Sequence, residues 1–366
     1  MLRVVVIGCG LQGLEIARDL AKDTHVAVCD IDKMHLNQCR KYGITDLHQL
    51  DIHDTKRLYD IIKKYDVVVG AVPSKHGFKL VTDVIKAGKN MVDISFMPED
   101  ALKLDVLAKK YKVKVVVDCG LAPGISNMLV GHAAANLKRI DEIHIAVGGL
   151  PQNPKPPLNY RTVFYLPDVI EEYTRKVTVI LNGKAKIVEP LTGLEKISFK
   201  GVGDFEYFLT DGLRSLAKTI KNVGTMVEKT IRYPGHTSQI KTLIECGFFD
   251  TKPMSFCCSK RSPRDFALAV LRDKLALGKD KDITFFRVVI KGERNLKYEM
   301  VDRFTNGVTS MARTTGYPCA IVARLMDRIN NIGIIPPEEL GKDNGIFDTF
   351  IRELNKRGVK IKEQIL

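Results

Sequence analysis

The sequence predicts an α/β protein in which a doubly wound parallel sheet is followed by an α+β domain built on an antiparallel sheet. In the first third of the chain, short apolar stretches typical of buried strands alternate with helical patterns. Beyond that region, longer stretches alternate between apolar and polar residues, which is typical of antiparallel strands with one solvated face. The length of 366 residues also favours two domains over one.

The chain begins with a pattern typical of a dinucleotide-binding turn. An apolar strand over residues 4–7 leads into Gly8, Gly10 and Gly13, and a helical pattern then continues to Leu20. This is G-x-G-x-x-G between a strand and a helix, where free backbone N–H groups at a helix N-terminus can bind a pyrophosphate. The first glycine allows the tight turn, the second lets the backbone approach the pyrophosphate, and the third lets the helix pack on the strand. The expected cofactor contacts here are Gly8, Gly10, Leu11, Gln12 and Gly13.

An acidic residue marks the end of the second predicted strand. Asp30 lies twenty positions after the second glycine, where a carboxylate can accept hydrogen bonds from the adenosine ribose hydroxyls. That carboxylate would repel a 2′-phosphate, and the next residues, Ile31 and Asp32, supply no arginine to receive one. The sequence therefore predicts NAD rather than NADP, with Ile31 beside the adenosine, although Lys33 and Arg40 are basic residues nearby in the sequence.

Four further stretches complete the predicted parallel sheet, at residues 46–52, 67–73, 91–95 and 113–118. Ligands of such sheets bind beyond the carboxyl ends of the strands. We therefore expect the ends of the third and fourth strands to border the cofactor. The residues expected there are Asp51, Ile52, Ala71, Val72, Pro73 and Ser74.

The second half of the chain has a different organisation. A proline-rich loop without periodicity covers residues 151–168, and its length suggests a functional role. The stretch 175–190 contains Asn182-Gly183, a signal for a type I′ hairpin turn. Helical patterns at 236–246 and 263–277 are expected to cover the buried face of the antiparallel sheet. A long amphipathic helix is predicted at 308–329, with Pro318 expected to kink or break it.

Composition excludes several classes of protein. The formal charge is +14, but the lysines lie beside acidic residues on helix faces and no basic stripe with aromatic residues occurs, so we expect no nucleic-acid partner. No apolar run reaches membrane-spanning length and no signal peptide is recognised, so we expect a cytoplasmic protein without membrane contact. The eight cysteines form no C-x-x-C pair, which argues against a metal site or a disulfide framework. The adjacent Cys257 and Cys258 have no interpretation from the sequence.

Three further motifs are more specific than the glycine turn: DCGLAPGISN at 118–127, DGLRSL at 211–216 and TIRYPGH at 230–236. With TTGYPCA and GIIPPE nearer the end, they make the whole chain resemble the saccharopine dehydrogenase family. The resemblance implies a Rossmann domain interrupted by an inserted catalytic domain, with the last helices returning to the first half, and a homodimer formed through the inserted domain. We therefore expect a dinucleotide-binding domain at 1–122, an α+β substrate and dimerisation domain at 123–305, and returning C-terminal helices at 306–366.

Within this family the chain most resembles the L-lysine 6-dehydrogenases. It is short for a saccharopine-cleaving enzyme, and Tyr160 and Arg161 are followed by Thr-Val-Phe-Tyr rather than by a serine-containing run. The resemblance implies that hydride passes from the side-chain amine carbon of L-lysine to NAD+, giving 2-aminoadipate 6-semialdehyde and ammonia. The alternatives are a saccharopine or carboxynorspermidine dehydrogenase activity, and a regulatory module that binds NAD without turning it over.

Oxidation of an amine requires a neutral nitrogen. Because a lysine ammonium has a pKa of about 10.4, a base must help to remove its proton. A histidine is more often structural than catalytic, and an aspartate at a strand end also caps the following turn, so these readings stay open. The candidate catalytic residues are His76, Asp93, Asp118 and His236.

The carboxylate end of an amino-acid substrate needs hydrogen-bond donors. A guanidinium pairs bidentately with a carboxylate, so Arg161 and Arg232 are the expected substrate-binding residues, together with the neighbouring Tyr160. Either arginine could instead form a salt bridge within the second domain.

Overall fold

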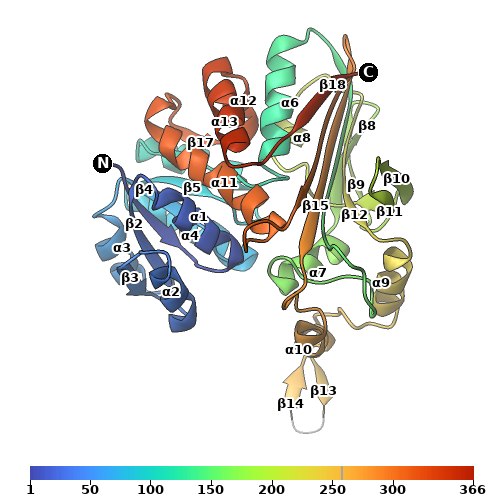
Figure 1. Ribbon diagram of the computed structural model, residues 1–366, viewed down its shortest axis with the longest axis horizontal. Helices are drawn as coiled ribbons and strands as arrows, with labels where there is room; N and C mark the ends of the chain where they lie inside the picture. The colour runs from blue at the N-terminus through green and yellow to red at the C-terminus, as the bar shows by residue number, and fades with distance from the viewer. Residues whose placement is uncertain (257–258) are drawn as a thin grey trace. The chain divides into compact units, whose positions relative to one another are not determined.

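The computed structural model describes residues 1–256 and 259–366, so Cys257 and Cys258 lie outside the described residues. The chain divides into two compact units (Figure 1). The first comprises Met1–Arg139, Arg214–Ile220 and Ala312–Ile361, and the second comprises Ile140–Leu213, Lys221–Met311 and Lys362–Leu366.

The first unit is built on a parallel sheet. Within the described residues it has seven strands in the order β17-β6-β5-β4-β1-β2-β3. Strands β1 to β6 thus follow the order 3-2-1-4-5-6 that is typical of dinucleotide-binding folds, and every pairing is parallel. The doubly wound parallel sheet predicted from the sequence is confirmed. The strands are β1 (Arg3–Ile7), β2 (His25–Asp30), β3 (Asp46–Gln49), β4 (Val67–Gly70), β5 (Asn90–Asp93), β6 (Lys114–Val116) and β17 (Gly333–Ile335).

Helices cover both faces of this sheet. Val5 and Val68 of the sheet lie in one apolar cluster with residues of α3, α4 and α5, whereas Val4 and Val69, which point to the opposite face, are also fully buried. The helices of this unit are α1 (Leu11–Leu20), α2 (Lys33–Arg40), α3 (Thr55–Ile62), α4 (Ser74–Lys86), η1 (Ala101–Leu104), α5 (Asp105–Lys110), α6 (Ile125–Asn136), α8 (Leu216–Thr219), η2 (Met326–Arg328), α12 (Pro337–Gly341) and α13 (Asn344–Lys356).

Helix α6 lies in the first unit, although the sequence placed it in the second domain, which was expected to begin at residue 123. Two glycines allow α6 and α12 to pack backbone against backbone. A Cβ atom on Gly131 would lie 2.0 Å from the carbonyl oxygen of Glu338, and one on Gly341 would lie 2.1 Å from that of Met128. The first unit therefore continues to Arg139 before the chain enters the second.

Helix α11 (Ser310–Leu325) is not broken at Pro318, which was one of the two outcomes expected there, since it continues through this proline. Proline removes one backbone hydrogen bond from a helix interior. The residues that follow, from Cys319 to Ala323, are at most 1% exposed. Because burial of an amphipathic face supplies most of the stability of a helix in a protein, packing here outweighs the lost hydrogen bond.

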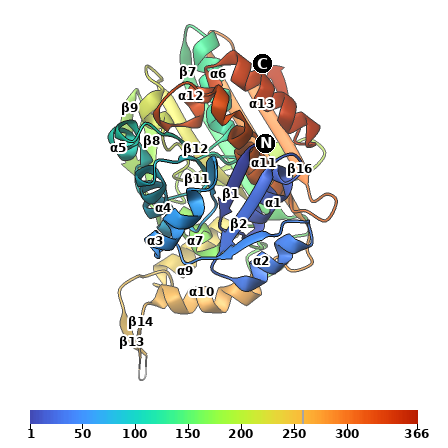
Figure 2. The same cartoon turned by 90° about the vertical axis from the view of Figure 1, so that its left-hand side faces the viewer.

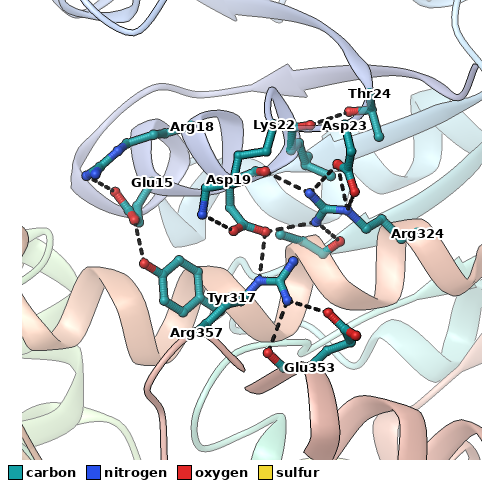
Figure 3. Close-up of polar contacts among 12 residues, drawn as sticks. Glu15, Arg18, Asp19, Lys22, Asp23, Thr24, Tyr317, Arg324, Glu353 and Arg357 are labelled. Atoms are coloured by element: carbon teal, nitrogen blue, oxygen red, sulfur yellow. Dashed lines mark hydrogen bonds and ion pairs between the residues drawn. The ribbon is translucent and has the colours of Figure 1, made fainter. Parts of the chain in front are cut away.

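The returning helices are tied to α1 by a network of charges (Figure 3). The Asp19 carboxylate is fully buried and accepts hydrogen bonds from Arg324 Nη1 at 2.8 Å and Arg357 Nε at 3.0 Å. Nearby, the Tyr317 hydroxyl donates to Glu15 at 2.8 Å. These contacts join α11 and the end of α13 to the helix that follows the glycine turn, so the last part of the chain completes the first unit.

The second unit is built on a mixed sheet. Its main strand order is β10-β11-β12-β7-β15-β16-β18, with β8 pairing on β12 and β9 pairing on β8 among the residues that the structure describes. The sequence predicted an antiparallel sheet, but β12 and β7 pair in parallel. Alternation along a strand reports which face is buried and not the direction of its neighbour, so the sequence could not show this. The strands are β7 (Ile140–Pro151), β8 (Val177–Leu181), β9 (Lys184–Val188), β10 (Glu195–Phe199), β11 (Gly203–Leu209), β12 (Thr225–Arg232), β15 (Asp282–Gly292), β16 (Leu296–Arg303) and β18 (Lys362–Ile365).

The predicted hairpin turn is confirmed. Strands β8 and β9 pair in an antiparallel arrangement, and both turn residues have positive φ, 53° at Asn182 and 72° at Gly183. The helices of this unit are α7 (Leu166–Thr174), α9 (His236–Glu245) and α10 (Pro263–Lys274). A further hairpin, β13 (Met254–Phe256) and β14 (Ser259–Arg261), projects beyond α10 in both views (Figures 1 and 2).

Candidate functional site

The glycine turn between β1 and α1 has the geometry that a dinucleotide needs. Gly8 has φ +95°, and a Cβ there would lie 2.4 Å from the carbonyl oxygen of Ala71. A Cβ on Gly13 would lie 2.0 Å from the carbonyl oxygen of Gly8, so both glycines are required by close packing. A Cβ on Gly10, in contrast, would meet nothing within 4 Å. The middle glycine therefore faces the open space in which a pyrophosphate would lie.

The beginning of α1 is suited to an anion. Gly10 is its N-cap residue and supplies no side-chain cap, and the first turn contains no acidic residue. The first N–H groups of a helix have no partner within the helix and carry a partial positive charge. Leu11, in the first turn, is 49% exposed. These features fit the binding of a pyrophosphate at this helix end.

Asp30 lies at the carboxyl end of β2, as expected, and its carboxylate is held in a fixed orientation. Its Oδ2 accepts from the backbone N–H of Cys9 at 2.6 Å and its Oδ1 from that of Asp32 at 2.8 Å. The ring nitrogen Nδ1 of His35 lies 3.4 Å from Oδ1. Because a carboxylate has about four acceptor positions, it retains capacity for two ribose hydroxyls. Ile31, which follows it, is 64% exposed.

The end of β4 borders the glycine turn, and the end of β3 lies beside Asp30, where the Leu50 N–H donates to the Asp30 carbonyl at 3.0 Å. The Ala71 N–H donates to the carbonyl of Ile7 at 2.8 Å, which places the residues after β4 beside the glycine turn. Val72 and Ile52 pack on the apolar core from its edge. Of the other predicted contacts in this region, Pro73 is half-buried, Ser74 is buried and Asp51 is exposed.

His76 lies on the side of β3. Its ring meets that of His53 edge to face at a centroid distance of 5.2 Å, and His53 follows Asp51 and Ile52 in the chain. Burial, and next the charge of Lys75, lower the pKa of His76, which favours the neutral form of its ring. This location groups His76 with the residues expected to border the adenine, rather than with the two candidate aspartates.

Asp93 and Asp118 form a second group, at the ends of β5 and β6. Asp93 is fully buried, and burial raises the pKa of its carboxyl group to about 8. Its Oδ1 accepts from the backbone N–H of Ser95 at 2.8 Å, and the Ser95 hydroxyl lies 3.1 Å from Oδ2. A Cβ on Gly70 would lie 2.0 Å from Oδ2, so the glycine at the end of β4 makes room for this acid. A carboxyl group with these properties can exchange a proton near neutral pH.

Asp118 forms an ion pair. Its φ of +53° is unusual for a residue other than glycine, and Arg214 Nε lies 3.3 Å from both of its carboxylate oxygens. The guanidinium of Arg214 also stacks over the ring of Phe96 at 5.1 Å. Sequence reasoning did not single out Arg214, although it lies in the DGLRSL motif. Its separation of 96 residues from Asp118 gave no local signal of the contact.

Arg232, in the second unit, is buried and paired. Its Nη2 binds Glu172, its Nε donates to the Tyr173 hydroxyl at 3.0 Å, and its Nη1 donates to the carbonyl of Ile231 at 2.9 Å. The guanidinium also stacks over the Tyr160 ring at 4.7 Å. With Arg232 only 1% exposed, these contacts favour the internal salt bridge over the binding of a substrate carboxylate.

His236 lies in the same cluster. Its Nδ1 is 2.9 Å from the carbonyl of Leu158, which can only accept, so Nδ1 carries the proton and Nε2 accepts from the Tyr173 hydroxyl at 3.0 Å. Burial, with the neighbouring Arg232 charge, lowers the pKa of His236 to about 3. The neutral ring of His236 has both nitrogens in hydrogen bonds, and it connects α9 to the proline-rich loop. These contacts favour a structural role for His236.

The proline-rich loop contributes Tyr160 to this cluster, whereas the side chain of Arg161 bonds to backbone carbonyl groups of the loop itself. Tyr160 is 1% exposed, and its hydroxyl has no hydrogen-bond partner among the described residues. Arg161 Nη1 donates to the carbonyl of Tyr160 at 2.7 Å and its Nη2 to that of Pro156 at 3.3 Å. The predicted substrate-binding residues Tyr160 and Arg232 thus lie together, whereas Arg161 mainly closes the loop.

Glu228 is a buried acid that the sequence did not indicate. It lies on β12, where the Thr210 hydroxyl donates to its Oε2 at 2.6 Å, and burial raises its pKa to about 8. One glutamate in an alternating strand carries no signal of such burial.

Neither a metal centre nor a membrane span is found in the part of the chain that the structure describes. No group of three or more His, Cys, Asp or Glu side chains there is arranged to hold a metal ion. None of the helices in residues 1–256 and 259–366 has the length and apolar character needed to cross a membrane.

The parallel sheet, the open glycine turn and the acid at the end of β2 define a protein with a pyridine-nucleotide-binding domain. Comparison with known families gives the same class. The saccharopine dehydrogenase NADP binding domain matches residues 4–117, and the saccharopine dehydrogenase C-terminal domain matches residues 120–359. The chain belongs to the saccharopine dehydrogenase family and is an oxidoreductase of that family.

Curated relatives and a solved structure are similar over most of the chain. It is 21% identical to saccharopine dehydrogenase [NADP(+), L-glutamate-forming] of Pyricularia oryzae, covering 87% of this chain and 88% of that protein. It is 20% identical to the mitochondrial alpha-aminoadipic semialdehyde synthase of Mus musculus, over 68% of this chain and 28% of that longer protein. The apo structure of saccharopine dehydrogenase (L-Glu forming) from Saccharomyces cerevisiae covers all of both chains with a TM-score of 0.82 at 19% identity. That likeness confirms the predicted fold class.

Proposed function

We propose that this chain oxidises the side-chain amine of L-lysine with NAD+, giving 2-aminoadipate 6-semialdehyde and ammonia. The choice of NAD+ is carried by Asp30. Its carboxylate is fixed by the N–H groups of Cys9 and Asp32 at the end of β2, where it would bind ribose hydroxyls and repel a 2′-phosphate. The family model and the Pyricularia oryzae relative are named for NADP, so the proposal distinguishes this chain from them.

The choice of lysine is supported by the two candidate arginines. Saccharopine carries two more carboxylates than lysine, and each would need donors of its own. Arg161 is bonded to backbone carbonyls of the proline-rich loop, and Arg232 is buried against Glu172. With both guanidinium groups engaged internally, a substrate with a single carboxylate fits this chain better.

The protein must hold the dinucleotide and handle protons. Gly8, Gly10 and Gly13 with the first turn of α1 would hold the pyrophosphate, and Asp30 the ribose. When bound, NAD+ supplies the acceptor for the hydride. The amine must be neutral before its carbon can lose hydride, and this chain has to accept that proton.

We propose Asp93 as the group that accepts the proton of the substrate amine, because its pKa of about 8 lets the carboxyl group change its protonation state in the neutral to alkaline range. Ser95, whose hydroxyl lies 3.1 Å from Asp93 Oδ2, is suited to relay the proton. The ion pair of Asp118 with Arg214 would position the neighbouring chain after β6.

The test compares substrates by both products. The purified protein is given NAD+ with L-lysine, saccharopine or alanine, and reduced nicotinamide and released ammonia are measured in parallel. We expect equal amounts of reduced cofactor and ammonia with L-lysine, and no reaction with alanine. Oxidation of saccharopine with release of glutamate and no ammonia would overturn the choice of substrate.

A second candidate is the oxidation of saccharopine, which is favoured by the names of the relatives above. The assay just described separates the two. A protein that binds NAD+ tightly but turns over none of these amines would instead be a regulatory module.

The cofactor choice is tested with Asp30→Ala. Loss of two hydrogen bonds to a charged group is expected to weaken NAD+ binding at least about tenfold. The affinity for NADP+ should rise relative to that for NAD+, because the repulsion of the 2′-phosphate is removed. The matched control Asp60→Ala replaces an exposed aspartate of α3 that pairs with Lys63. Equal weakening of both cofactors by Asp30→Ala would contradict the assignment.

A further inference from the structure

Two cysteines lie in contact behind the glycine turn. Cys9 is the residue between Gly8 and Gly10, and Cys39 lies in the last turn of α2, thirty residues further along the chain. Their Sγ atoms are 2.9 Å apart, and both residues are at most 1% exposed. A disulfide bond of about 2.05 Å would bring the two sulfurs closer by only about 0.9 Å.

The environment of the pair makes one sulfur the better nucleophile. The hydrogen bond between the two thiols lowers the pKa of Cys39, and the same contact raises that of Cys9. The carbonyl oxygen of His35 lies 3.6 Å from Cys39 Sγ and 4.0 Å from Cys9 Sγ. Because the thiolate is the reactive form of cysteine, Cys39 is the sulfur that an oxidant would meet first.

Helix α2 gives access to the pair. It has eight residues, of which only Leu36 and Cys39 are buried. Segments with few buried apolar side chains open locally at low cost in free energy. Opening of α2 would expose both sulfurs without unfolding the parallel sheet.

We propose that Cys9 and Cys39 are a redox-active pair whose disulfide weakens dinucleotide binding. The Cys39 thiolate attacks one oxygen of a peroxide and becomes a sulfenic acid, and the other oxygen leaves as hydroxide, which takes up a proton to form water. Cys9 then attacks the Cys39 sulfur, the S–O bond breaks and a second water leaves. Overall, two thiols lose two electrons and two protons to hydrogen peroxide, which is reduced to two waters. A dithiol reverses the step by exchange.

The effect on binding follows from the position of Cys9, and it rests on the proposed dinucleotide site. The Cys9 N–H donates to Asp30 Oδ2 at 2.6 Å, so this residue joins the pyrophosphate turn to the ribose-binding carboxylate. Binding groups must be held to within about 0.5 Å of their productive positions. The bond shortens the distance between the sulfurs by about 0.9 Å, and the turn that carries Cys9 has to take up the part of this movement that α2 does not. The bond therefore disturbs the alignment of the turn with Asp30.

The experiment uses the full chain with hydrogen peroxide as the oxidant and NAD+ as the probe. Peptide mapping by mass spectrometry is expected to find Cys9 joined to Cys39 after oxidation. Calorimetric titration should show NAD+ binding weakened about tenfold, the equivalent of misaligning one charge-assisted hydrogen bond. Dithiothreitol should restore both the thiols and the affinity.

Two variants complete the test. Cys39→Ser should lose both the crosslink and the response of NAD+ affinity to peroxide. The matched control Cys246→Ser, at an exposed cysteine of the second unit, should keep both. If oxidation of the unmodified chain gave no bond between Cys9 and Cys39, the proposal that they form a redox-active pair would be wrong. If the crosslinked form bound NAD+ with the same or higher affinity, the proposal that the disulfide weakens binding would be wrong. Absence of NAD+ binding in both forms would overturn the proposed cofactor site, whereas the mapping would still decide the disulfide.

Discussion

Replacing Asp19 by asparagine is expected to destabilise the first unit. The carboxylate is fully buried and lies 2.9 Å from Lys22 Nζ, in addition to its contacts with Arg324 and Arg357 (Figure 3). Removing one partner of a buried ion pair costs about 3–5 kcal/mol. Both arginines keep a second carboxylate, Asp23 for Arg324 and Glu353 for Arg357, so neither is left unpaired. We therefore expect a loss of about 2–3 kcal/mol, below the full cost of an unpaired charge.

Calorimetry measures this loss as a shift of the unfolding transition. For a unit of about 200 residues, 2–3 kcal/mol corresponds to a fall in Tm of roughly 5–10 °C. The matched control Asp23→Asn removes a side chain that is 57% exposed and should cost at most about 1 kcal/mol. Equal shifts for the two variants would show that the buried ion pairs of Asp19 do not stabilise the first unit.

The pH dependence gives a second check on Asp19. Burial alone would raise the pKa of Asp19, but the charges of Arg324 and Arg357 outweigh it and hold the pKa below its ordinary value. The unfolded chain therefore binds the proton more readily than the folded chain. The stabilisation is present above the unfolded pKa of about 3.9 and is lost as the pH falls through the folded pKa. The difference in Tm between parent and Asp19→Asn should accordingly shrink in acid, and a constant difference would contradict the ion-pair explanation.

Two further predictions concern the glycine turn and the buried acid. Gly13→Ala should destabilise the protein by about 1–3 kcal/mol because its Cβ would lie 2.0 Å from a backbone oxygen. Gly10→Ala should keep the Tm of the parent because its Cβ would enter open space, and it should lose NAD+ affinity because the pyrophosphate would lie in that space. Thermal unfolding and NAD+ titration of both variants separate these effects, and a normal Tm for Gly13→Ala would show that the packing argument is wrong. At Asp93, burial raises the folded pKa to about 8, so the parent binds a proton that the unfolded chain has lost, and this group makes the parent less stable as the pH rises from about 4 toward 8. Asp93→Asn, which resembles the protonated acid, should gain stability relative to the parent over that pH range. The same variant should lose turnover. If turnover with L-lysine and its pH profile were unchanged, Asp93 would not be the proton acceptor.

Much of the first unit could be predicted because its signals are local. The strand, glycines and helix of the turn lie within the first twenty residues, and Asp30 follows at the end of the next strand. Fully buried parallel strands read as apolar runs, so the sheet could also be recognised from the sequence. The exact strand ends were less predictable, since β3 and β4 stop at Gln49 and Gly70, before the expected limits at 52 and 73. Ala71, the residue after β4, still lies beside the turn.

The candidate residues could be placed on elements but their environments could not be foreseen. Asp93 and Asp118 both lie at the ends of strands of the same sheet, yet one is a buried acid bonded to Ser95 and the other is paired with Arg214. The two predicted arginines of the second unit also have internal partners, which the sequence left as an open alternative. Partners of this kind come from distant parts of the chain, and sequence spacing carries no information about them.

The order of amino acids was enough to predict the doubly wound sheet, the dinucleotide turn and the acid that follows it, because backbone geometry and apolar periodicity are set by neighbouring residues. Three features could be seen only in the folded chain: the parallel pairing of β12 with β7, the continuation of α11 through Pro318 and the contact between Cys9 and Cys39. The folded chain also provides the burial that raises the pKa of Asp93 and lowers that of His236. Strand pairing and side-chain contacts depend on which distant segments meet when the chain packs. The pKa of a side chain depends in the same way on the distant groups that bury it or place a charge beside it.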